Sequence, residues 1–167
     1  IDSALAKNPK DALAQRYLGE TRGLRARFRA RHEQGGPEDF AEAARAFQAS
    51  IDLAPEDLDH QLAFGEFCRA WAAGQQDPRR EPGPALERGL ALANQVLAAR
   101  PTWPEARILR ASLLVLQAQR SPDVAQQREQ AARAAEDFTW ALAANPALEN
   151  VWKSQAALAQ RLAATRP

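Results

Sequence analysis

Apolar-rich stretches of helical length recur along the 167-residue chain, and each runs through a short tail into a proline. The prolines stand 46, 46 and 45 residues apart, at Pro9, Pro55, Pro101 and Pro146. An aliphatic residue precedes each proline by four positions: Leu5, Ile51, Leu97 and Leu142. Self-similarity at a fixed period predicts a repeat architecture, in which each unit buries its apolar face against its neighbours.

Small residues keep the same register as the prolines. Ten positions after the four prolines stand Gly19, Gly65, Ala111 and Ala156. Twelve positions before the last three prolines stand Ala43, Gly89 and Ala134. Because small side chains let two helix axes approach closely, we expect these positions at contacts between successive helices.

The pattern predicts helices over 10–32, 37–53, 56–74, 84–99, 103–119, 122–144 and 148–164. Three of them open on a proline, which suits a first helical turn, and a small residue precedes each as its cap. These prolines are Pro37, Pro84 and Pro122, after Gly36, Gly83 and Ser121. Thr102 and Glu105 have the spacing of a capping box. No segment alternates with a period of two, so the expected class is all-α.

This pattern resembles the tetratricopeptide repeat (TPR) family, whose 34-residue unit has small residues at interhelical contacts and a proline after its second helix. Phe47 and Phe138 match the aromatic position of the second helix, and Trp152 matches a large aromatic position of the first. The resemblance implies a right-handed superhelical solenoid of antiparallel helix pairs. We expect one domain over 1–167, a fragment of a longer chain, with pairs over 10–53, 56–99 and 103–144 and a capping helix at 148–164.

The repeat exceeds the family unit by about twelve residues, which lie between the two helices of each pair. The second of these extensions resembles the loops of long TPR units in the C-terminal tails of certain bacterial serine/threonine kinases. Gly74, Asp77, Pro78, Arg79 and Leu86 carry this second resemblance. It implies a regulatory tail of a signalling kinase, although no kinase catalytic motif occurs in the chain.

Composition narrows the classes of function. The hydrophobic fraction of 46% is typical of a globular protein, and the net charge of +1 gives no general attraction to nucleic acid. Apolar runs such as 113–116 are too short for membrane insertion. One cysteine fits a reducing compartment, so we expect a cytoplasmic location. Abundant arginine and alanine are typical of a GC-rich bacterial genome.

Candidate chemistry is sparse, and we expect no enzyme activity, metal or cofactor in this chain. The only histidines are His32 and His60. His60 and Cys68 are eight residues apart on one helix, but no further ligands follow at the spacing of a metal site. The favoured interpretation places Cys68 in the core and His60 at a helix start.

The helix over 10–32 carries an arginine-rich face with Arg22, Arg25 and Arg29. Its apolar stripe is predicted to pack inward: Tyr17, Thr21, Leu24 and Phe28. The arginines either bind phosphate groups, with Arg79 and Arg80 extending the site, or form a solvated helix face. Without exposed aromatic side chains between them, the solvated face is favoured. Of the large aromatics, Trp71 and Trp103 are expected to be structural, whereas Trp140 either packs on the last helix or marks a self-association surface.

In a helical solenoid the first helices of successive pairs line a concave face, where partners usually bind. The register places these residues on that face: Arg16, Glu20, Asp59, Leu62, Glu66, Arg69, Glu105, Ile108 and Ser112. The alternative is that Arg16 with Glu20, and Glu66 with Arg69, form ion pairs along one helix. The leading hypothesis is a non-catalytic scaffold that binds a protein or peptide there. A small-ligand sensor that regulates an attached enzyme, and a self-association module, remain open.

Overall fold

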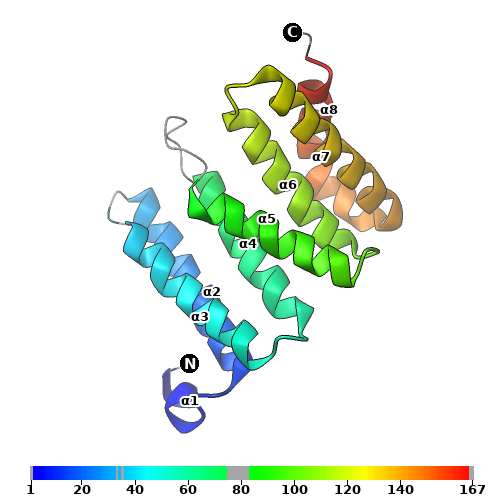
Figure 1. The fold of residues 1–167 in the computed structure, drawn as a ribbon. Coiled ribbons are helices and arrows are strands. Elements are labelled where there is room, and N and C mark those ends of the chain that lie inside the picture. Colours follow the sequence, from blue (N-terminus) through cyan, green and yellow to red (C-terminus); the bar gives the residue numbers. More distant parts are fainter. Residues whose placement is uncertain (1, 33, 35, 75–82, 166–167) are drawn as a thin grey trace.

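The computed structural model describes residues 2–32, 34, 36–74 and 83–165, and these residues form helices without any strand. The prediction of an all-α chain is therefore confirmed for the described residues (Figure 1). The helices are α1 (Asp2–Lys7), α2 (Ala12–Arg31), α3 (Pro37–Leu53), α4 (Leu58–Gly74), α5 (Pro84–Ala99), α6 (Pro104–Arg120), α7 (Val124–Ala144) and α8 (Glu149–Ala163). A short 3₁₀ turn, Pro146–Leu148, precedes α8. Asp77, Pro78, Arg79 and Arg80 lie outside the described residues.

Two of the predicted cap signals, at Pro122 and at Thr102, are not used in the structure. The helix predicted from Pro122 begins at Val124, because the Asp123 carboxylate accepts hydrogen bonds from the backbone N–H groups of Ala125 and Gln126, at 2.8 and 3.4 Å. The capping box at Thr102 does not form. Trp103 is the N-cap of α6 and makes no side-chain cap bond.

Consecutive helices form antiparallel pairs, α2 with α3, α4 with α5 and α6 with α7, and α8 packs on α7 (Figure 1). The first helices of the pairs also contact one another in series, from α2 to α4, α6 and α8. Each second helix contacts the first helix of the next pair, as α3 contacts α4, α5 contacts α6 and α7 contacts α8. Each internal helix pair is therefore packed on both sides along the chain.

Aromatic rings fill the core between the first two pairs. Phe47 of α3 stacks on Phe64 of α4, with ring centroids 5.3 Å apart and planes 5° apart. Phe67 lies against Phe40, Phe47 and the Trp71 ring at the end of α4. A second cluster, around Phe138 and Ile108, joins the third pair to α8.

Small residues allow these rings to approach α2. A Cβ atom on Gly19 would lie 2.8 Å from the Phe47 ring, and one on Gly23 would lie 2.7 Å from the Phe67 ring. At Gly65 the same atom would lie 2.6 Å from a methyl group of Leu109 in α6. The predicted role of Gly19 and Gly65 at close helix contacts is therefore confirmed.

The same rings overturn the predicted orientation of α2. Its buried residues are Gly19, Gly23 and Ala26, whereas Leu24 and Phe28 are 60% and 62% exposed. Thr21 and Tyr17 are exposed as well. The predicted inward stripe is thus on the outside, because the Phe47 and Phe67 rings leave space beside α2 only for small side chains.

The remaining tryptophans are at least half-buried. Trp103 packs against the small cluster that contains Val96, Leu97 and Ala106, so its structural role is confirmed. Trp140 packs against the cluster around Phe138, and the Arg107 guanidinium lies 4.3 Å from its ring centroid.

Candidate partner-binding surface

Four of the predicted surface residues form two ion pairs on neighbouring first helices. Arg16 and Glu20 of α2 are 3.4 Å apart at i and i+4, and Glu66 and Arg69 of α4 are 2.8 Å apart at i and i+3. Each pair lies along a single helix, as the alternative interpretation expected. Pairs of this kind stabilise a helix by only about 0.5 kcal/mol. The carboxylates of Glu20 and Glu66 are 41% and 38% exposed, so they remain available to a partner.

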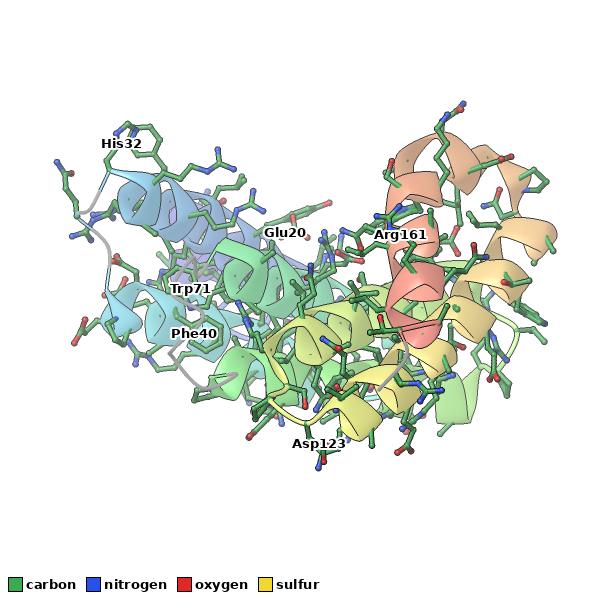
Figure 2. The ribbon with its side chains drawn as sticks, turned by 90° about the horizontal axis from the view of Figure 1, so that it is seen from above. Glu20, His32, Phe40, Trp71, Asp123 and Arg161 are labelled. Carbon is green, nitrogen blue, oxygen red and sulfur yellow. The ribbon has the colours of Figure 1, made fainter. Side chains whose placement is uncertain are left out.

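Arg69 also connects two helices. Its guanidinium lies 5.2 Å from the ring centroid of Trp152 in α8, while its Nε atom donates a hydrogen bond to the Glu66 carboxylate. The side chain therefore extends from α4 to α8, although these two helices belong to units separated by the α6–α7 pair. Figure 2 shows Glu20 of α2 and Arg161 of α8 on the sides of these two helices that face each other.

Two predicted surface residues, Ile108 and Ser112, are buried, with 2% and 1% exposure. Ile108 belongs to the cluster in which α8 covers α6, and the Ser112 hydroxyl donates to the backbone carbonyl of Leu109. Neither side chain is accessible to a partner. The prediction was wrong because the repeat register identifies the first-helix positions but does not reveal that α8 covers this face of α6.

The three other predicted residues are not brought together. Leu62 is half-buried between the first aromatic cluster and the Trp103 cluster. Asp59 lies in the first turn of α4, where its backbone N–H donates to the Asp57 carboxylate. Glu105 is at the start of α6 and accepts a hydrogen bond from Asn145, at the end of α7. The surface that remains, which we call the inner face, comprises Arg16, Glu20, Glu66, Arg69 and Trp152.

Sequence reasoning missed a buried carboxylate that is held by two arginines between α6 and α7. Asp137 of α7 is 3% exposed and accepts from both Arg110 and Arg107 of α6. Arg110 donates through two nitrogens, at 2.6 and 2.8 Å, and these hydrogen bonds raise the pKa of its guanidinium. The arginines occupy i and i+3 on one helix face, which is the only signal that the sequence offered. Because the carboxylate is satisfied by two cations inside a helix pair, its evident effect is to hold α6 against α7.

The histidine and cysteine singled out by sequence are both buried. His60 lies in the first turn of α4, where its Nδ1 atom is 3.2 Å from the Ser50 carbonyl oxygen and its Nε2 atom is 3.5 Å from Asp57. Burial raises the pKa of the Cys68 thiol to about 12. The described part of the chain contains no group of three or more residues arranged to hold a metal ion. None of its helices is long and apolar enough to cross a bilayer.

An open groove of about 500 Å³ lies between the second helices α3 and α5. Its apolar lining includes Phe40, Ala44 and Phe64. Arg88 of α5 donates a hydrogen bond to Gln48 of α3 at the same groove, and its guanidinium lies 5.5 Å from the Phe64 ring centroid. The groove therefore combines an apolar wall with one cation, Arg88, and one carboxylate, Glu87.

No known protein family, curated protein or solved structure matches this chain.

Proposed function

We propose that the protein is a non-catalytic scaffold that binds a peptide or protein segment on its inner face. The proposal includes a TPR-like, right-handed helical solenoid, in which the first helices of the pairs form one continuous concave surface. A role as the regulatory tail of a cytoplasmic signalling kinase in a bacterium belongs to the same proposal. This kinase-tail role is supported by the 46-residue register alone, since the residues that carry the kinase resemblance lie partly outside the described structure.

The observation that carries the proposal is the contact between Arg69 and Trp152. It brings a guanidinium, the Glu66 carboxylate and an indole ring from α4 and α8 to one place. Tryptophan and arginine are the residue types that contribute most binding energy at protein interfaces. Glu20 and Arg16 on α2 add a second pair of opposite charges. Alternating charges beside an aromatic ring suit a polar peptide with an apolar anchor.

A peptide-display selection on the intact chain tests this proposal. We expect selected peptides to bind the wild type and to lose at least about tenfold in affinity with the Glu20→Arg/Glu66→Arg variant. The matched control is Glu129→Arg/Glu136→Arg, which places the same charge change on exposed positions of α7. Equal affinity of the selected peptides for both variants contradicts the proposal, as does failure to select any peptide.

The groove between α3 and α5 favours a second candidate function, a sensor for a small apolar ligand with one anionic group. Phe40 and Phe64 would contact the apolar part, and Arg88 would meet the charge. A thermal-shift screen of aromatic and aliphatic carboxylic acids measures such binding, because a ligand that binds only the folded state raises the melting temperature. An Ala44→Trp variant fills the groove and should abolish the shift. A shift that persists in this variant contradicts the assignment.

A further inference from the structure

Large apolar side chains are exposed mainly on one helix. Of the seven exposed large hydrophobic residues among those described, four lie on α2: Leu13, Tyr17, Leu24 and Phe28. Their spacing of four, seven and four residues places them on one face, since a helix turns by 100° per residue. This face, which we call the outer stripe, lies opposite the buried face of Gly19, Gly23 and Ala26. A stripe of this length exceeds the scattered single exposures that are normal on a protein surface.

The repeat register shows what this face does elsewhere in the molecule. Tyr17 and Leu109 both stand eight residues after the proline of their repeats, and Leu24 and Leu116 both stand fifteen residues after it. In α6, Leu109 contacts α4 beside Gly65, and Leu116 packs against the first aromatic cluster. The outer stripe of α2 therefore occupies the positions through which an equivalent helix docks onto another helix. The positions of the outer stripe are therefore suited to contact with another helix.

Charge at the outer stripe restricts the partner. Arg25 and Arg27 lie on opposite flanks of the stripe, Arg31 lies at its end, and the three border an open depression of about 450 Å³ together with Leu24 and Phe28. None of the three arginines forms an ion pair with another described residue. The α2 sequence contains six arginines and a single acidic residue. A partner with carboxylates beside its apolar face is complementary to this arrangement.

Two arrangements of a second copy of the chain do not provide that complement. The exposed charges of α8, at the opposite end of the molecule, are the cations Lys153 and Arg161 and one carboxylate, Glu149. Head-to-tail stacking would bring these cations towards the arginines of α2. Two α2 helices face to face would likewise oppose arginine-rich surfaces, and such like-charge contacts disfavour association.

We propose that the outer stripe of α2 binds an acidic amphipathic helix of a partner protein. Leu24 and Phe28 insert between apolar side chains of the partner, and Arg25, Arg27 and Arg31 pair with carboxylates along its flanks. This mode follows the general way in which apolar anchors at helical spacing dock on a complementary surface. The two surfaces adjoin on α2, where the Arg16 guanidinium lies 5.2 Å from the Tyr17 ring centroid. The proposed contacts of Leu24, Arg25, Arg27, Phe28 and Arg31 lie further along the helix and do not involve Arg16 or Glu20, so each proposal can fail without the other.

The probe is a fluorescein-labelled helical peptide of about 21 residues, with leucine and alanine on one face and glutamate elsewhere. Fluorescence anisotropy should show saturable binding to the wild-type chain. We expect Leu24→Ser/Phe28→Ser and Arg25→Glu/Arg31→Glu each to weaken binding by about tenfold or more. Matched controls, Val124→Ser/Val151→Ser and Arg128→Glu/Arg133→Glu, change exposed residues of α7 and α8 and should leave affinity unchanged.

Circular dichroism melting of every variant verifies that the fold is intact, as expected for side chains that are largely exposed. A peptide with lysine in place of glutamate should not bind. Equal binding of both peptides, or undiminished binding to the Leu24→Ser/Phe28→Ser variant, overturns the proposal. It is also overturned if the acidic peptide fails to bind while a labelled oligothymidine or a phosphatidylserine vesicle binds through α2. Light scattering provides a further test of the proposal. If the wild-type chain dimerises and the substitutions on α2 abolish the dimer, the stripe binds a second copy and the proposal is overturned.

Discussion

Helices α2 and α6 occupy the same position in the repeat but differ sharply in what they bury. In α6, the buried set includes Ile108, Leu109, Leu113 and Leu114. In α2, it consists of two glycines and one alanine, and four of its large apolar side chains are exposed. Helix α6 contacts α4 and α5 on one side and α7 and α8 on the other, whereas α2 in the described structure contacts α3, α4 and the short helix α1. Leu24 and Phe28 of its outer stripe stay 60% and 62% exposed.

The difference shows that a position in the repeat fixes the direction of a side chain but not its burial. Tyr17 and Leu109 have equivalent places on their helices, yet their exposures are 45% and 0%. Burial depends on whether another helix is present on that side. A large apolar residue therefore contributes to stability in α6, whereas in α2 it is available for binding.

The largest expected loss of stability tests this comparison at the two equivalent positions, Leu109 and Tyr17. Leu109→Ala leaves a cavity beside Gly65 and should lower the free energy of unfolding by about 3 kcal/mol. Tyr17→Ala should lower it by less than about 1 kcal/mol, because the ring is already largely in contact with water. Urea denaturation followed by circular dichroism measures both. Similar losses at the two positions would show that α2 is covered in solution.

The ion pairs within the first and third helix pairs allow a second test. Asp137→Ala leaves Arg107 and Arg110 without their shared carboxylate, and it should cost about 2–3 kcal/mol. Asp39→Ala removes the 2.7 Å pair with Arg29 and the hydrogen bond from the Gly36 N–H group at the start of α3, and it should cost about 1 kcal/mol, since Arg29 is more exposed than Arg107 and Arg110. The midpoints of urea denaturation, compared at a constant dependence of the unfolding free energy on urea, measure the difference between the two variants. An equal cost would mean that burial of Asp137 adds nothing to the contact between α6 and α7.

The close helix contacts give smaller effects of unequal size. Gly23→Ala forces the buried Phe67 ring to move and should destabilise the protein by about 1–2 kcal/mol. Gly65→Ala meets a methyl group of Leu109, which can rotate away, and the better helix propensity of alanine offsets about 1 kcal/mol. Thermal unfolding should therefore rank Gly65→Ala above Gly23→Ala in stability. The reverse order would contradict the assignment of the Phe67 ring as the obstacle.

The smallest expected effects concern the inner face. Arg69→Gln removes both the Glu66 ion pair and the contact with Trp152, and it should cost about 1 kcal/mol. Arg16→Gln removes the i,i+4 pair with Glu20 and the contact with the Tyr17 ring, and it should cost about 0.3 kcal/mol, because the Tyr17 ring is exposed whereas Trp152 is half-buried. High-precision thermal melts at low and high salt measure these values. A loss at Arg69 no greater than that at Arg16 would show that the Trp152 contact does not hold α8 in place.

Much of the architecture followed from the sequence because it depends on local signals. Pro37 and Pro84 open helices where predicted, and Gly19, Gly65 and Gly89 lie at close helix contacts. Individual cap bonds were less predictable. Helix α7 begins after Asp123 rather than at Pro122, because the Asp123 carboxylate accepts hydrogen bonds from two backbone N–H groups. Glu105 accepts a hydrogen bond from Asn145, at the end of α7, rather than from the N-cap of its own helix.

The periodicity of prolines and small residues determined the helices, their order and their points of closest approach, because each of these depends on residues near one another in the chain. Tertiary structure alone decided which faces are covered. Ile108 is inaccessible because α7 and α8, later in the chain, pack over it, and Leu24 and Phe28 are exposed because aromatic rings from α3 and α4 occupy the other side of α2. The burial of a side chain depends on which elements lie next to it in space. A local sequence pattern does not show whether a helix face has another helix against it.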